Sequence, residues 1–283
     1  MQRIFHTPEG VRDIYNGECS QKHHLQTEIR TVFDSYGYEE IETPSFEYFE
    51  VFSREVGTIP SKDLYKFFDR EGNTLVLRPD FTPSVSRACA TYFNPEKEVV
   101  SLCYTGNTFI NNSSFRGRLK ETTQMGVERM GDDSPEADAE ILAMTVECLL
   151  ATGLTEFQVS VGQVDYYKAI FAQTGLSQEE EEELRELISQ KNYFGVEELV
   201  KNKKATPLVR ADLPSQLPQM FGSTEVLEKA KSLTDNPQAL KAVARLEEIY
   251  ELLKVYGYEK YVTFDFAMLS KYHYYTGIIF QAY

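Results

Sequence analysis

Two strand-like segments on either side of a mostly polar loop constrain the fold of this chain more than any other feature. Residues 99–104 and 122–129 carry apolar and β-branched side chains, and residues 111–120 between them are largely polar. Short apolar segments separated by a polar connection are typical of neighbouring strands in an antiparallel sheet. We therefore predict that the two segments pair.

Helical patterns alternate with further strand patterns along the chain, which favours the α+β class. Apolar residues recur at helical spacing in residues 17–35, 82–92 and 136–152. Thr82 is an acceptable helix cap and Pro83 suits the first helical position. Short apolar or β-branched runs predict strands at residues 40–43, 64–69, 74–77, 157–161, 261–266 and 274–283. We expect residues 70–73 to form a hairpin turn and the last strand to be buried.

Residues 166–255 show a different pattern, in which helical segments are interrupted by glycine and proline. We predict a helical insertion there, within a core domain formed by residues 1–165 and 256–283. The acidic run Glu179–Glu183 opens one helix of the insertion. Negative charge is favourable at the start of a helix, so we interpret this run as a solvated surface and not as a binding patch.

The composition argues against a nucleic-acid partner. The 283 residues include 29 Lys and Arg but 44 Asp and Glu, and the resulting net charge of −15 repels phosphate backbones. The four cysteines and four histidines show no metal-binding spacing, so we expect reduced thiols, no metal and no cofactor. Neither a secretion signal nor a run of about 18 apolar residues occurs, so we expect a cytoplasmic protein without a membrane partner.

Short motifs along the chain carry a family resemblance. They read TPEGVRD at 7–13, TPSFE at 43–47, LRPDFT at 77–82, FINN at 109–112, QMGVE at 124–128 and YYTG at 274–277. Together they resemble histidyl-tRNA synthetase and, more closely, its relatives, the regulatory subunits of ATP phosphoribosyltransferase in histidine biosynthesis. The resemblance implies the α+β fold of a class II aminoacyl-tRNA synthetase catalytic domain, with a mainly antiparallel sheet flanked by helices. It also implies a homodimer whose interface includes residues 40–43.

The resemblance further implies that the catalytic residues of the synthetase are lost. Adenylation requires cationic groups that stabilise negative charge on the ATP phosphate. The synthetase motif Phe-Arg-x-Glu aligns with residues 109–112, so that Ile110 stands in place of the arginine and Asn112 in place of the glutamate. A second catalytic arginine aligns with Ser270. Two such losses would slow adenylation by roughly four orders of magnitude or more.

The groups that recognise histidine in the synthetase are mostly retained. The resemblance places Asp80, Thr82 and Gln124 around the ammonium group of the amino acid and Glu128 with Tyr275 around its imidazole, and it counts Tyr274 among the histidine-binding residues. A carboxylate and neutral acceptors suit an ammonium group, and a carboxylate with a phenol can bond both imidazole nitrogens. The pocket also departs from the family pattern, because Asp80 replaces a glutamate, Phe81 a glycine and Lys120 an arginine. Without the resemblance, the same residues are more typical of a solvent-facing strand and core aromatics.

The resemblance therefore implies a non-catalytic regulatory subunit, in a hetero-oligomer with the short-form catalytic subunit of ATP phosphoribosyltransferase. The catalytic subunit would need it for activity, and histidine would inhibit the first step of the pathway through it. Two alternatives are a divergent enzyme that adenylates histidine and a tRNA-binding module, which would bind in a salt-dependent way. The residues leave open whether histidine binds in this chain or at the subunit interface, and whether the chain is C-terminally truncated.

Overall fold

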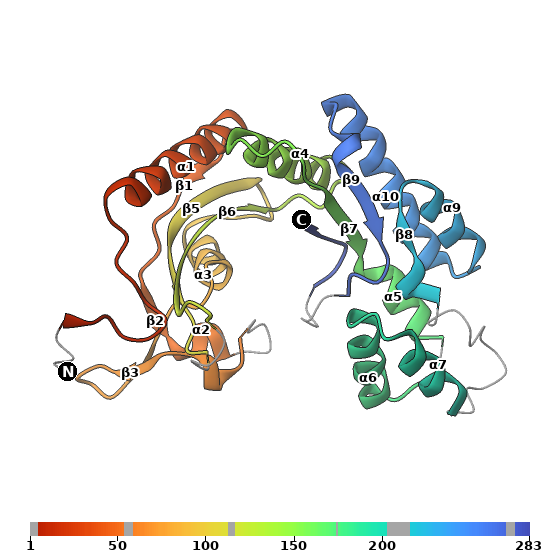
Figure 1. Cartoon of the computed structure of the whole chain (residues 1–283), viewed down its shortest axis with the longest axis horizontal. Coiled ribbons are helices and arrows are strands. Elements are labelled where there is room, and N and C mark those ends of the chain that lie inside the picture. The colour runs from red at the N-terminus through yellow and green to blue at the C-terminus, as the bar shows by residue number, and fades with distance from the viewer. Residues whose placement is uncertain (1–4, 54–58, 113–116, 174, 203–215, 270–274) are drawn as a thin grey trace. The chain divides into compact units, whose positions relative to one another are not determined.

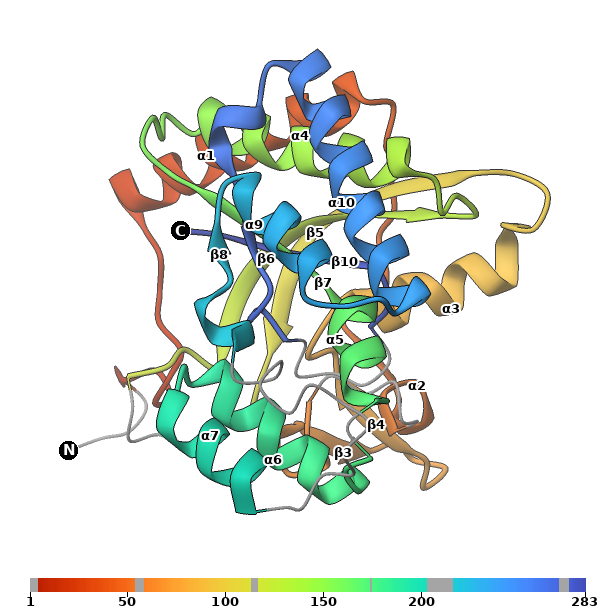
Figure 2. The same ribbon diagram turned by 90° about the vertical axis from the view of Figure 1, so that its right-hand side faces the viewer.

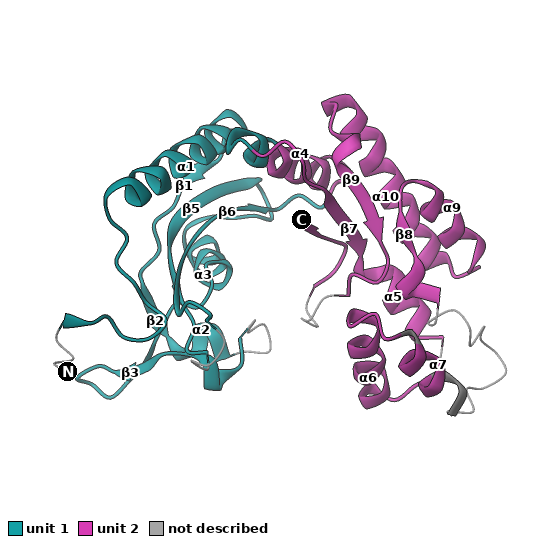
Figure 3. Ribbon diagram, viewed as in Figure 1, with its two compact units in different colours: residues 1–133, 147–153 teal, residues 134–146, 154–283 magenta. Residues whose placement is uncertain are grey.

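The protein contains two compact units. The computed structural model describes residues 5–53, 59–112, 117–173, 175–202, 216–269 and 275–283 (Figure 1). Residues 1–133 and 147–153 form the first unit, and residues 134–146 and 154–283 form the second (Figure 3). Helix α4 (Pro135–Ala151) therefore contributes residues to both units.

A long strand pair dominates the first unit. Its elements are α1 (Asn16–Ser35), β1 (Glu39–Glu40), β2 (Phe46–Tyr48), α2 (Phe49–Ser53), η2 (Ser61–Asp63), β3 (Lys66–Phe68), β4 (Thr74–Leu77), α3 (Thr82–Tyr92), β5 (Val100–Phe109) and β6 (Glu121–Met130). Strands β5 and β6 pair antiparallel along their whole length, which confirms the predicted strand pair and extends it. Strand β1 joins β5 in parallel, so this sheet has the order β1-β5-β6.

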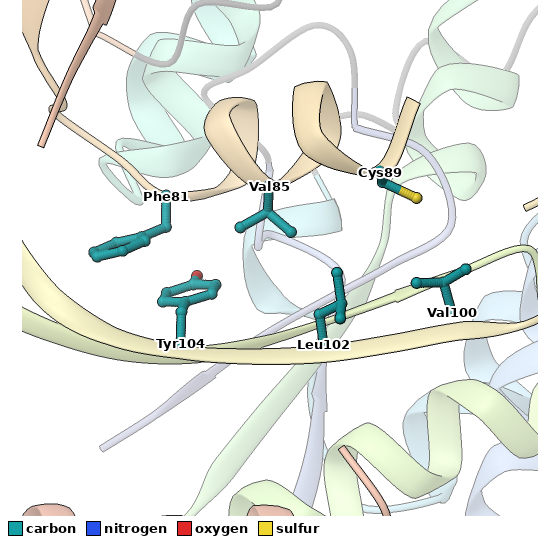
Figure 4. Packing of buried hydrophobic residues seen from close by; sticks show 6 residues of the cluster. All are labelled: Phe81, Val85, Cys89, Val100, Leu102 and Tyr104. Carbon is teal, nitrogen blue, oxygen red and sulfur yellow. The ribbon is translucent and has the colours of Figure 1, made fainter. Parts of the chain in front are cut away.

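Helix α3 covers one face of this sheet and α1 lies on the other side (Figure 1). Figure 4 shows Phe81, Val85 and Cys89 above alternate residues of β5, which are Val100, Leu102 and Tyr104. Successive side chains of a strand point to opposite faces, so Cys103 points away from α3. Its thiol contacts the Tyr38 carbonyl oxygen at 3.8 Å, just after the end of α1.

A second, smaller sheet of the first unit has the order β2-β4-β3. Strands β3 and β4 pair antiparallel, which confirms the predicted hairpin, and the Asp69 carboxylate accepts a 2.8 Å hydrogen bond from the Asn73 backbone N–H in its turn. Arg78, directly after β4, links this sheet to the long strand pair. Its buried guanidinium donates to the carbonyl oxygens of Thr43 at 2.7 Å and Asn107 at 2.8 Å.

The second unit is built on a four-stranded sheet with the order β10-β7-β9-β8. Its elements are β7 (Val159–Gln163), α5 (Val164–Phe171), α6 (Gln178–Ser189), α7 (Tyr193–Asn202), η4 (Leu217–Gln219), β8 (Phe221–Gly222), α9 (Glu225–Ser232), α10 (Pro237–Tyr256), η5 (Glu259–Tyr261), β9 (Val262–Asp265) and β10 (Ile278–Ala282). Strands β7 and β9 are buried and pair in parallel. Helix α10 packs against α5, α9 and β7 (Figure 2).

The described strands form three small sheets, in which β1 with β5 and β7 with β9 pair in parallel and the other five strand pairs are antiparallel, so the pairing is mainly antiparallel as predicted. The strands differ from the sequence predictions in two respects. The strand predicted at 40–43 is limited to Glu39–Glu40. The prediction that residues 274–283 are buried is wrong, because β10 lies at the edge of its sheet and its residues are half-buried or exposed.

Two observations on the described residues bear on the class of protein. They contain no group of three or more histidine, cysteine or acidic side chains that is arranged to hold a metal ion. Among the helices formed by these residues, none combines the length and the apolar character that crossing a bilayer requires.

Replacement of Arg78 by methionine should destabilise the first unit. The Arg78→Met variant keeps most of the side-chain volume but leaves the carbonyl groups of Thr43 and Asn107 without their donor, which should cost about 3 kcal/mol. Urea denaturation measures the loss. Arg70→Met, at an exposed arginine in the β3–β4 turn, is the control and should stay within about 0.5 kcal/mol of the parent. Equal stability of the two variants would contradict the structural role of Arg78.

Candidate functional site

The start of α3 meets the face of the β5–β6 sheet at a cluster of polar side chains. In the strand register, Leu102 lies opposite Glu128 and Gly106 lies opposite Gln124. Directly paired residues of neighbouring strands project from the same face. Glu128 and Gln124 therefore point to the face that α3 covers, as does Tyr104 (Figure 4).

The structure brings Asp80, Thr82 and Glu128 together. The Thr82 hydroxyl donates a 2.7 Å hydrogen bond to Glu128 Oε1. The prediction that Thr82 caps α3 is wrong, since the N-cap residue is Phe81, whose side chain makes no capping hydrogen bond. Thr82 is instead the first helical residue, and its hydroxyl is committed to Glu128 on β6. The Asp80 carboxylate lies 3.5 Å from the Thr82 backbone nitrogen.

The electrostatics of this cluster are set by two neighbouring carboxylates. Burial raises the pKa of Glu128, and the negative charge of Asp80 raises it further, whereas hydrogen bonds from Thr82 and Tyr104 lower it. Burial also raises the pKa of the Tyr104 phenol, and Glu128 and Asp80 act in the same direction. The phenol therefore stays protonated at neutral pH and can donate. Carboxylates suit a ligand that brings ammonium or ring N–H donors.

Aromatic and glycine residues shape the sheet beside these carboxylates. The rings of Phe81 and Tyr104 stack with centroids 4.3 Å apart, and the Arg78 guanidinium carbon lies 4.0 Å from the Phe81 centroid. A Cβ at Gly106 would lie 2.5 Å from Arg78 Nη2, and a Cβ at Gly126 would lie 2.4 Å from the Tyr104 hydroxyl. Sequence reasoning missed the roles of Arg78 and Tyr104. Gly126, inside the strand predicted at 122–129, was an available signal, because a glycine within a strand marks a place where another group approaches the backbone closely.

Three further residues singled out in the sequence, Tyr275, Ile110 and Asn112, are among those that the structure describes. Tyr275 belongs to the second unit, where its backbone carbonyl accepts a 2.8 Å hydrogen bond from Lys168 Nζ. Tyr274 and Ser270 lie outside the described residues. Ile110 follows β5, with its backbone N–H bonded to the Lys120 carbonyl, and Asn112 donates to the Leu119 carbonyl.

The family model and the curated relatives that match this chain point to the same family. The model of the histidyl-tRNA synthetase family matches residues 10–283. A relative from Acetivibrio thermocellus, named ATP phosphoribosyltransferase regulatory subunit, is 42% identical over 98% of this chain and 66% of that protein. A relative of the same name from Clostridium acetobutylicum is 37% identical over 98% of this chain and 68% of its own length. The chain thus spans about two thirds of the length of these curated relatives.

Solved structures share the fold. A crystal structure from Bacillus halodurans C, described as an ATP phosphoribosyltransferase regulatory subunit/histidyl-tRNA synthetase, is 31% identical, with a TM-score of 0.89 over 99% of this chain and 73% of that chain. A histidine–tRNA ligase subunit from Alicyclobacillus acidocaldarius is 21% identical, with a TM-score of 0.74 over 98% of this chain and 85% of that chain. The predicted α+β fold of the class II synthetase type is confirmed.

Replacement of Glu128 by glutamine should stabilise the fold at neutral pH. Because the pKa of Glu128 is raised on folding, its contribution to stability is present at low pH and is lost as pH rises through the folded pKa. The Glu128→Gln variant cannot ionise, so its advantage should grow from pH 5 to pH 8 and reach about 1 kcal/mol, or roughly 2–4 °C in melting temperature.

Thermal unfolding across this pH range tests the prediction. Glu96→Gln, at an exposed glutamate between α3 and β5, is the control and should show no pH-dependent gain. A Glu128→Gln variant less stable than the parent at pH 8 would show instead that the ionised carboxylate stabilises the fold.

Proposed function

Because this chain belongs to the histidyl-tRNA synthetase family and, within it, to the ATP phosphoribosyltransferase regulatory subunits, we propose that it regulates that enzyme and performs no chemistry itself. In this proposal it acts in the cytoplasm, in a hetero-oligomer with a short-form catalytic subunit that needs it for activity. The observation that carries the proposal is the 42% identity over nearly the whole chain to a protein of that name.

Histidine is the proposed effector, and the polar cluster at the start of α3 is its proposed site. An ammonium group brings three donors, for which Asp80 and Gln124 are acceptors, and an imidazole N–H can donate to Glu128. The hydrogen bond between Thr82 and Glu128 supports this assignment, because it fixes the direction of the carboxylate before a ligand arrives. A ligand without N–H donors would leave these acceptors unpaired, which is a strong basis for selectivity.

The resemblance of the sequence motifs to those of the synthetase also supports the proposal that this chain does not adenylate histidine. An apolar side chain at Ile110 cannot stabilise charge on a phosphate, and Ser270 has no cationic group either. The chain would therefore keep the recognition of the amino acid and lose its activation. Feedback follows by linkage, if histidine binds more tightly to the inhibited assembly than to the active one.

We also propose a homodimer in which the outer face of the β2-β4-β3 sheet takes part. Tyr48 lies opposite Leu75, which lies opposite Phe67, so both aromatic rings point to one face, and Phe46 follows the same alternation. The exposed fractions of Phe46, Tyr48 and Phe67 are 50%, 56% and 37%. A cluster of exposed aromatic side chains is typical of a protein interface, and this one adjoins the segment that the family resemblance assigns to the dimer.

A charge on this face should dissociate the dimer. Tyr48→Asp should raise the dimer dissociation constant by about 30-fold or more, because a carboxylate would be buried among aromatic rings. Sedimentation equilibrium measures the change. Phe68→Asp is the matched control, since Phe68 is 72% exposed on the opposite face of the same sheet and should leave the dimer intact. A dimer unaffected by Tyr48→Asp would place the interface elsewhere.

The regulatory proposal predicts the behaviour of the reconstituted enzyme. Phosphoribosyltransferase activity of a short-form catalytic subunit should rise when this chain is added and should fall as histidine is titrated in. Asp80→Asn should raise the histidine concentration for half-inhibition by about 10-fold or more, because a neutral amide oxygen replaces the charged carboxylate as acceptor for the ammonium group. The phosphoribosyltransferase activity of each variant complex is expressed as a fraction of its own activity without histidine. Asp235→Asn, at an exposed aspartate of the second unit, is the control.

The outcome separates the proposal from its rivals. If this chain neither raises the activity nor confers inhibition, the regulatory proposal fails. Histidine-dependent exchange of pyrophosphate into ATP would then identify a divergent adenylating enzyme, and the proposal expects no such exchange.

A further inference from the structure

We propose that Lys120 binds the carboxylate of the amino acid at the same site, and that the backbone of Gly10 holds the Lys120 side chain in position. The inference rests on the proposed function, because it concerns the ligand assigned to this site. It also gives a role to the TPEGVRD motif at residues 7–13, which contains Gly10.

Lys120 continues the face of the β5–β6 sheet that carries Gln124 and Glu128. The Ile110 backbone N–H donates a 2.9 Å hydrogen bond to the Lys120 carbonyl oxygen, one residue beyond the last paired residues of β5 and β6. The register of the two strands is therefore maintained at Ile110 and Lys120. Because successive side chains of a strand alternate between its faces, Lys120 shares a face with Gln124 and Glu128.

The order of the groups along this face matches the order of the groups in histidine. Glu128, proposed for the imidazole, is followed toward the start of β6 by Gln124, proposed for the ammonium group, and then by Lys120. Lys120 lies four residues from Gln124, about 13 Å along the strand, which two long side chains with a ligand between them can span. The carboxylates of Asp80 and Glu128 repel a ligand carboxylate, so the favourable place for that group is beside a cation at the other end of the face.

Gly10 packs directly against the aliphatic part of Lys120. The Lys120 backbone N–H donates a 2.7 Å hydrogen bond to the Gly10 carbonyl oxygen. A Cβ on Gly10 would lie 2.6 Å from Cγ and 2.9 Å from Cδ of Lys120. Gly10 has a φ of +86°, a left-handed conformation that favours glycine. The backbone at Gly10 therefore limits the directions in which the Lys120 side chain can extend.

The charge of Lys120 suits an anionic ligand. The residue is half-buried, and within the part of the chain that the structure describes no carboxylate forms an ion pair with it. Ile110, directly across from it, is apolar and offers no counter-charge. An ammonium group that has lost part of its hydration gains a charge-assisted hydrogen bond from a ligand carboxylate. The three donors of Lys120 allow this bond without a strict geometry.

A ligand that lacks the carboxylate tests the inference. Isothermal titration calorimetry compares histidine with histidinol, in which a neutral hydroxymethyl group replaces the carboxylate, on the complex with the catalytic subunit. Lys120→Met keeps the aliphatic part of the side chain and removes the charge, so it should weaken the binding of histidine by about 10-fold or more. The same substitution should leave the binding of histidinol unchanged. Lys120→Arg keeps the charge and should retain most of the affinity for histidine.

A second lysine controls for the loss of charge alone. Lys97 is exposed in the turn between α3 and β5, and Lys97→Met removes the same charge from the first unit. The binding of histidine and of histidinol should both stay at the wild-type level in this variant.

Two glycine variants test the positioning by Gly10. Gly10→Ala brings a methyl group onto the Lys120 side chain, so it should weaken the binding of histidine, and not that of histidinol, by a smaller factor than Lys120→Met. Gly72→Ala, in the β3–β4 turn, is the matched control, because Gly72 has a φ of +88° and nothing lies within 4 Å of an added Cβ. It imposes similar backbone strain and should leave the affinity for both ligands unchanged.

The possible outcomes are distinct. A wild-type complex that binds no histidine overturns both the proposed function and this inference. If the wild-type complex binds histidine, then equal affinity for histidinol overturns the inference alone. Unchanged binding of histidine by Lys120→Met, or equal weakening of both ligands, also overturns it alone, because Lys120 then makes no specific contact with the carboxylate. An effect of Gly10→Ala no larger than that of Gly72→Ala overturns the role of Gly10.

Discussion

A buried guanidinium organises the part of the first unit on which the candidate site depends. Arg78 directly follows β4, and its side chain is bonded to the carbonyl oxygens of Thr43 and Asn107, so it ties the smaller sheet to the long strand pair. Burial of a cation is costly, and here burial lowers its pKa, yet the carbonyl groups and the Phe81 ring replace much of the lost hydration. Asp80 and Thr82 follow within a few residues, so their position is set by the same contacts.

The sequence was sufficient for features that depend on local pattern. The strand pair, the β3–β4 hairpin and the start of α3 at Thr82 follow from periodicity and turn residues, and each is confirmed. Features that depend on contacts distant in sequence were not predictable in this way. The hydroxyl of Thr82 bonds Glu128, which is 46 residues away, because tertiary structure offers a better partner than the helix end does. The exposure of β10 likewise depends on its place in the sheet.

The site as proposed separates two properties that a synthetase combines. Recognition of an amino acid requires acceptors for its N–H groups, and activation requires cations at a phosphate. In this chain Asp80, Thr82 and Glu128 form a cluster, and the proposal places the apolar Ile110 where a synthetase would have a cation. Binding alone is sufficient for a regulator, because a ligand shifts an equilibrium by its difference in affinity for two states. The proposed regulator would therefore need only the first of these properties.

The first turn of α3 has an electrostatic consequence for the site. The peptide dipoles of a helix add up to a partial positive charge at its first turn, where backbone N–H groups lack partners within the helix. The first turn of α3 is where Asp80 and Glu128 come together. The helix thus supplies a fixed positive potential that eases the repulsion between the two carboxylates.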